Sequence, residues 1–129
     1  MPRTVNIDDL IGVPYQVNGR GNPGYDCYGY AIEVCKRFGK TLPEIDGCMD
    51  VNYDFLECLE KGLSLGIVKE IPFPQTEGDL VFFKGTDGML NHIGVYLGFG
   101  LVTHCNSCGV HVEKLKRKEH YIGRCFTWL

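Results

Sequence analysis

The feature that most constrains this fold is a change of residue pattern near Pro74. Beyond that proline, short runs rich in β-branched and aromatic residues follow one another, separated by glycines, at residues 79–85, 92–98, 101–105, 110–115 and 121–128. Runs of this length and composition are typical of β-strands. A run of consecutive strands of this kind predicts an antiparallel sheet.

The residues before Pro74 carry helical patterns instead. Between Asp26 and Phe38 the apolar residues recur at spacings of three and four, and Gly39 follows as a stop. This predicts an amphipathic helix. Weaker patterns predict helices over 6–10 and 53–61, and the Gly- and Pro-rich residues 12–25 are typical of a long loop. Helices followed by consecutive strands predict an α+β fold with the sheet packed on the first helix.

Length and composition narrow the class of protein. A chain of 129 residues is expected to form one domain, spanning 1–129. Hydrophobic residues make up 44% and charged residues 22% of the sequence, which excludes a disordered protein.

Charge and hydropathy disfavour two kinds of partner. Thirteen Lys and Arg stand against sixteen Asp and Glu, and the basic cluster KLKRKEH, residues 114–120, is short. We therefore expect no nucleic-acid partner. The opening MPRTVNIDDL has no apolar core and no long apolar run follows, so we expect neither a signal peptide nor a membrane partner. Without a secretion signal, the seven cysteines are expected to be reduced.

Cys27 directly follows Asp26 at the start of the predicted helix. A helix N-terminus lowers the pKa of a thiol below its ordinary value of about 8.5, and a thiolate is the nucleophilic form. The free backbone N–H of Cys27 is also suited to stabilise an oxyanion. Cys27 is therefore a candidate nucleophile, and the alternative is a buried structural cysteine.

Two of the four histidines, His92 and His104, flank the hairpin signal GFG at residues 98–100. If all three residues form the loop, His104 lies opposite Gly94 and on the same face as His92, with Cβ atoms roughly 7–8 Å apart. A two-residue loop would shift the register by one residue and place the imidazoles on opposite faces. The predicted histidine pair therefore depends on the loop length.

A cysteine, an imidazole and a third group that orients the imidazole are the components of nucleophilic acyl transfer on several unrelated folds. Cys27, His92 and His104 can supply them. His111 and His120 are expected at the surface. Cys105 and Cys108 form a CxxC pair, but a zinc site needs two further ligands and no common spacing provides them.

Three ordered motifs resemble the NlpC/P60 family of cysteine peptidases. They are GVPYQVNGRGNPGYDCYGYAIEVCKRFG at 12–39, EGDLVFFKG at 77–85 and NHIGVYLGFGLVTHC at 91–105, and the resemblance covers about residues 10 to 127. It implies a papain-like α+β fold that hydrolyses amide bonds in peptidoglycan stem peptides, next to D-γ-glutamyl and a diamino acid, without a cofactor or metal.

The resemblance also implies roles for single residues. Cys27 matches the family's nucleophile, His92 the histidine that pairs with it, and His104 the residue that orients this histidine. Tyr15, Asp26 and Tyr28 fall at positions that we expect to bind substrate.

Two positions depart from the family pattern. Tyr28 stands where serine is usual, which resembles phage tail-associated members, and Cys105 stands where a small apolar residue is more common. Phage-tail or secretion components are therefore candidate partners that would carry the protein to the wall. A related amidase or acyltransferase, or a catalytically silent tail or wall component, are the alternatives.

Overall fold

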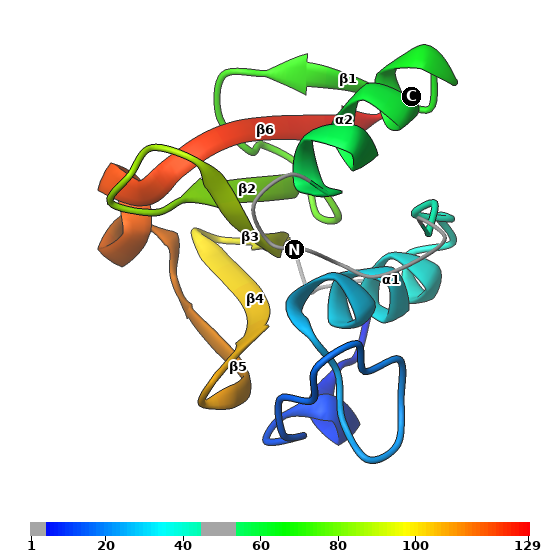
Figure 1. The fold of residues 1–129 in the computed structure, drawn as a ribbon, viewed down its shortest axis with the longest axis vertical. Helices are drawn as coiled ribbons and strands as arrows, with labels where there is room; N and C mark the ends of the chain where they lie inside the picture. The colour runs from blue at the N-terminus through cyan, green and yellow to red at the C-terminus, as the bar shows by residue number, and fades with distance from the viewer. Residues whose placement is uncertain (1–4, 45–53) are drawn as a thin grey trace.

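The computed structural model describes residues 5–44 and 54–129 and has the expected α+β fold (Figure 1). Its helices are η1 (Asp8–Leu10), α1 (Cys27–Arg37), α2 (Asp54–Ser64) and η2 (Leu115–Tyr121). Its strands are β1 (Val68–Ile71), β2 (Leu80–Lys84), β3 (Leu90–Gly98), β4 (Leu101–Asn106), β5 (Gly109–Lys114) and β6 (Ile122–Trp128). The strands form one antiparallel sheet in the order β1-β6-β2-β3-β4-β5.

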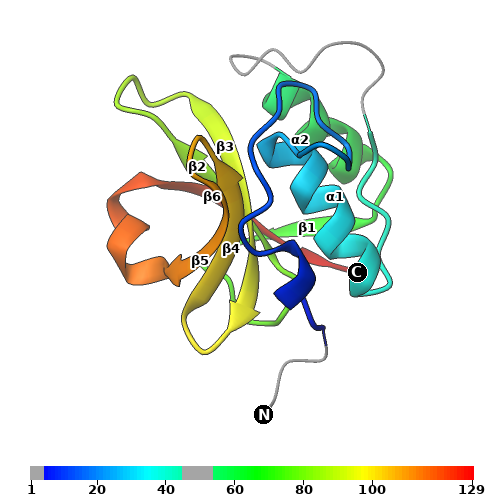
Figure 2. The ribbon, with the colours of Figure 1, turned by 90° about the horizontal axis from the view of Figure 1, so that it is seen from below.

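Both α-helices lie on one side of the sheet, as Figure 2 shows. The apolar side of α1 packs against the face of β3 that carries Ile93, Val95 and Leu97, and this contact forms the main core. None of the helices within 5–44 and 54–129 is long and apolar enough to span a membrane.

The other face of the sheet buries a second, smaller apolar cluster. It contains Val81, Phe83, Val102, Leu115 and Cys125. Because Leu115 belongs to η2, this short helix covers the sheet on the side opposite α1 (Figure 2). β2 is therefore buried on both faces, which accounts for its unbroken apolar sequence.

Two elements were not predicted from the sequence. β1 has apolar residues only at its ends, with Lys69 and Glu70 between them, so it lacks a strand pattern and is held by its pairing with β6. η2 coincides with the basic cluster at 114–120, whose side chains gave no helical periodicity.

The β3 and β4 hairpin keeps the predicted histidine register by a different route. Gly98 pairs with Leu101, so the loop is two residues long, and both loop residues have positive φ, 55° and 75°. The register shifts at Leu97, and beyond this bulge Val95 pairs with Thr103 as expected. The bulge offsets the shorter loop, and His92 and His104 stay on one face.

The loop before α1 is fixed in place by backbone contacts. Residues 12–13 exchange two hydrogen bonds of 2.9 Å with Val110 of β5. Nearer the helix, Gly29 lies so close to the loop that a Cβ there would be 2.1 Å from the carbonyl oxygen of Gly19. The first turn of α1 and the loop are therefore packed backbone to backbone.

Gly29→Ala is expected to destabilise the protein. The added methyl group collides with backbone that has little room to move, and such overpacking typically costs about 1–3 kcal/mol. Gly62→Ala in α2 is the matched control, because its nearest contact is a Val68 methyl at 3.2 Å and alanine favours a helix by about 1 kcal/mol. Urea unfolding should show the larger loss for Gly29→Ala, and equal losses would contradict the close packing.

Candidate active site

Cys27 is the first residue of α1. The side chain of Asp26 caps this helix by accepting a 2.6 Å hydrogen bond from the N–H of Gly29. Cys27 is buried, with 7% exposed, and the backbone N–H groups of Ile93 and Tyr28 are directed at its sulfur. Because Ile93 directly follows His92, the thiol lies against the part of the β3 backbone that carries this histidine.

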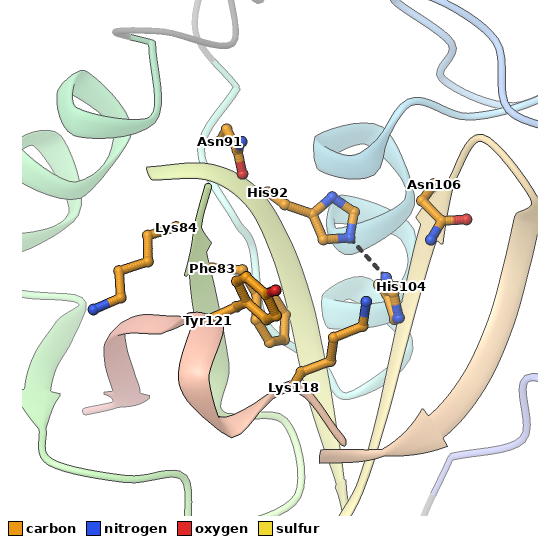
Figure 3. Close-up of a pocket in the computed structure, with 8 residues that line it drawn as sticks. All are labelled: Phe83, Lys84, Asn91, His92, His104, Asn106, Lys118 and Tyr121. Atoms are coloured by element: carbon orange, nitrogen blue, oxygen red, sulfur yellow. Dashed lines mark hydrogen bonds between the residues drawn. The ribbon is translucent and has the colours of Figure 1, made fainter. Parts of the chain in front are cut away.

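His92 and His104 are in direct contact. The Nε2 atom of His92 is 2.7 Å from the Nδ1 atom of His104, and the ring centroids are 4.8 Å apart (Figure 3). His104 is almost fully buried, whereas His92 remains partly exposed. The structure therefore brings together the pair that the sequence predicted.

A carboxylate continues this chain on the next strand. Glu113 Oε2 lies 2.9 Å from His104 Nε2 and also 2.9 Å from Nε2 of His111. His104 pairs with His111 across β4 and β5, and Glu113 is two residues further along the same face. His111, which was expected at the surface, is half-buried and takes part in this cluster. The alternation His111-x-Glu113 opposite His104 is the signal that sequence reasoning missed.

The hydrogen-bond partners assign the protons on the two imidazoles. Burial raises the pKa of Glu113, but hydrogen bonds from His104 and His111 outweigh this effect and lower it, so Glu113 is a carboxylate. An ionised carboxylate only accepts, so Nε2 of His104 carries the proton and Nδ1 accepts from the N–H at Nε2 of His92. This leaves a lone pair on Nδ1 of a neutral His92.

Burial also sets the charge states of the reactive groups. It raises the pKa of Cys27 to about 12, with a further contribution from Asp26, while the N–H groups of Ile93 and Tyr28 act in the opposite direction. Burial and the neighbouring His104 lower the pKa of His92 to about 3. Burial therefore outweighs the pKa-lowering effect expected from the helix N-terminus. Without substrate, Cys27 and His92 are both uncharged.

The three predicted substrate-binding residues differ in accessibility. Tyr15 is 38% exposed, and burial together with the nearby Cys27 raises its pKa. Asp26 is buried as the helix cap and forms a 2.8 Å ion pair with Arg20. The ring of Tyr28 is buried in the core and its hydroxyl donates to the carbonyl oxygen of Pro43. In this structure only Tyr15 presents its side chain to solvent.

The CxxC cysteines do not come together as a metal site in the described ranges. Cys105 is buried and its thiol donates to the carbonyl oxygen of Tyr25, at 3.3 Å, whereas Cys108 is exposed. Within 5–44 and 54–129, the group with the spacing of metal ligands is His104, His111 and Glu113, whose ligand atoms lie within 4.8 Å of one another. Of the remaining cysteines, Cys48 lies outside the described residues, so its place relative to this pair is left open.

A pocket of 310 Å³ opens beside the histidine pair (Figure 3). It is lined by residues of β2, β3, β4 and η2, namely Phe83, Lys84, Asn91, His92, His104, Asn106, Lys118 and Tyr121. The imidazoles are thus reachable from solvent on the side away from the main core.

Comparison with known proteins identifies the family to which the chain is similar. Residues 12–126 match the family model for the NlpC/P60 family. The chain is similar to a gamma-D-glutamyl-L-lysine dipeptidyl-peptidase of Bacillus subtilis, with 29% identity over 92% of this chain and 38% of that protein. It is also similar to the bifunctional muramidase/DL-endopeptidase CwlT of Bacillus subtilis, with 32% identity over 87% of this chain and 32% of that protein.

Solved structures agree on the fold. A crystal structure of an NlpC/P60 family protein from Bacillus cereus superposes with a TM-score of 0.64, at 24% identity, over 93% of this chain and 37% of that chain. The chain thus spans less than two fifths of the length of the curated relatives described above.

Removing the Glu113 carboxylate is expected to change the tautomers of both imidazoles. In the intact protein, ¹⁵N NMR should show His92 and His104 each protonated at Nε2. In Glu113→Ala, Nε2 of His104 loses its acceptor, so a mixture of tautomers should appear at both rings. Glu113→Gln is the control, because its amide oxygen can still accept the proton at Nε2. Unchanged spectra in Glu113→Ala would contradict the proton assignment.

Cys27 is expected to react slowly with iodoacetamide at neutral pH. Its raised pKa keeps the thiol protonated below about pH 12, so the rate should rise about tenfold per pH unit between pH 7 and 9. Peptide mapping separates Cys27 from the exposed Cys108. A rate that is independent of pH below 7 would instead reveal a thiolate paired with an imidazolium.

Proposed function

Because the chain belongs to the NlpC/P60 family, we propose that residues 1–129 act as one cysteine peptidase domain that hydrolyses amide bonds in peptidoglycan stem peptides. The bond we infer joins D-γ-glutamate to a diamino acid. The name of the Bacillus subtilis relative, a gamma-D-glutamyl-L-lysine dipeptidyl-peptidase, supports this choice. The observations that carry the proposal are the backbone contact of the Cys27 thiol with Ile93, the residue that follows His92 in β3, and the hydrogen bond that holds Nε2 of His92 against His104.

The first step is attack by Cys27 on the scissile carbonyl. As the sulfur–carbon bond forms, the thiol proton passes to Nδ1 of His92, the ring nitrogen left with a lone pair. Because the proton leaves as the bond forms, the step needs no free thiolate, which suits a site whose burial disfavours one. The backbone N–H of Cys27, at the free end of α1, stabilises the oxyanion.

The second step releases the two halves of the substrate. The carbon–nitrogen bond breaks as His92 returns its proton to the leaving amine, which leaves a thioester on Cys27. Water then attacks the thioester while His92 takes a proton from it, and the sulfur leaves and recovers that proton. His104, held by Glu113, keeps the His92 ring in one orientation throughout.

The predicted substrate-binding residues fit this scheme unequally. Tyr15 is exposed near Cys27 and is suited to contact the acyl half of the substrate. Asp26 acts through the helix, because its carboxylate caps α1 and pairs with Arg20. Tyr28 supports the loop at Pro43 and fixes the first turn of α1.

The test is mass spectrometry of muropeptides from walls that contain diaminopimelate and from walls that contain lysine. The reduced protein should release a new fragment whose mass identifies the bond, and Cys27→Ala should release none. Cys108→Ala is the matched control, because this cysteine is exposed and has no part in the proposed steps. The absence of a fragment in both walls, with the protein folded, would reject the proposed substrate.

A further inference from the structure

We infer that the pocket beside His92 and His104 binds the amine half of the substrate, and that Lys118 recognises a free carboxylate on the leaving residue. The inference rests on the proposed function and names the substrate chemistry of the same site. It adds a specificity residue from the basic cluster, which has no part in the proposed catalytic steps.

The position of the pocket decides which half of the substrate it receives. The acyl half stays on Cys27 at the end of α1 after the first step. The leaving nitrogen of the amine half must lie next to His92, because this imidazole delivers the proton to it. Since His92 and His104 form one wall of the pocket, the leaving residue is the part of the substrate that lies within its reach.

Lys118 is the cation that faces this wall. It lies on η2, is half-buried, and its amine points toward His104 in Figure 3. Its charge contributes to lowering the pKa of both His92 and His104, which agrees with a short separation. Lys118 forms no ion pair with any carboxylate of residues 5–44 and 54–129.

The charge of Lys118 also helps to lower the pKa of Glu113, but the two groups form no ion pair. An incoming carboxylate would give the half-buried amine a direct, charge-assisted partner. The rest of the pocket agrees with a small polar ligand, because Asn106 and Tyr121 provide hydrogen-bonding groups at its rim. Lys84 also lines the pocket, but its amine points away from the imidazoles and its side chain is exposed. The geometry therefore assigns the carboxylate to Lys118 alone.

The experiment compares two substrates that differ only at this carboxylate. L-Ala-γ-D-Glu-L-Lys has a free α-carboxylate on the leaving lysine, and its C-terminal carboxamide does not. Wild-type protein should cleave the acid about tenfold to hundredfold more efficiently, mostly through KM, as expected for a hydrogen bond between charged groups. Lys118→Met should abolish this preference, whereas Lys84→Met should retain it.

The substrate comparison separates this inference from a general effect on the histidines. If Lys118→Met slows both substrates equally, or if the wild type cleaves them equally, the carboxylate subsite is rejected while the peptidase stands. A tetrapeptide substrate, whose free carboxylate lies on the following D-alanine, tests the reach of the pocket. If the tetrapeptide acid is cleaved no better than its carboxamide, the carboxylate that Lys118 recognises is the one on the leaving residue. If the tetrapeptide acid is still preferred through Lys118, that placement is overturned.

A binding measurement keeps the test independent of catalysis. The Cys27→Ala protein can be titrated with the same acid and carboxamide peptides and followed by NMR. The acid should bind to Cys27→Ala with a lower Kd than the carboxamide, and the additional Lys118→Met substitution should remove this difference. That result supports the subsite even if no peptide is cleaved, and the proposed peptidase alone then fails. Equal Kd values for the two peptides would overturn the subsite.

Discussion

The hydrogen bond of 2.7 Å between His92 and His104 depends on one register of two strands. A hairpin with a two-residue loop would normally place these side chains on opposite faces of the sheet. The bulge at Leu97 supplies the extra residue that restores the register. The same register puts Leu97 into the main core, so a slip would expose apolar residues and separate the imidazoles at once.

Packing of α1 against β3 sets both the position and the electrostatics of Cys27. The contact that buries the helix also brings the thiol to the backbone of Ile93, next to His92. This burial keeps the thiol and the imidazole uncharged at rest, which favours a mechanism in which the proton moves to His92 as the sulfur attacks the carbonyl. Glu113, at the far end of the hydrogen-bond chain, fixes which nitrogen of His92 can take the proton.

The sequence was informative where the pattern is local. The helix starting near Cys27, the five later strands and the histidine pair follow from periodicity and from Gly-marked turns, and the family resemblance named the candidate nucleophile. Properties that depend on strand neighbours were missed. The sequence did not reveal the bulge at Leu97, the carboxylate of Glu113 behind His104, or the helix that carries Lys118 over the pocket.

Burial explains the remaining differences. The helix N-terminus at Cys27 predicted a lowered thiol pKa, but depth in the core could not be judged from the sequence and it reverses the shift. Tyr28 was expected to contact substrate, yet its ring fills the space beneath the loop and its hydroxyl bonds to Pro43. Delivery by phage-tail or secretion components stays a prediction.

The most direct test of this account is to trap the covalent intermediate. The protein would be mixed with L-Ala-γ-D-Glu-L-Lys, quenched in acid within milliseconds to seconds, digested and mapped by mass spectrometry. An L-alanyl-γ-D-glutamyl thioester should form on Cys27 as lysine is released and should then disappear. Release of lysine with no thioester on Cys27, or with the acyl group on another cysteine, would contradict it.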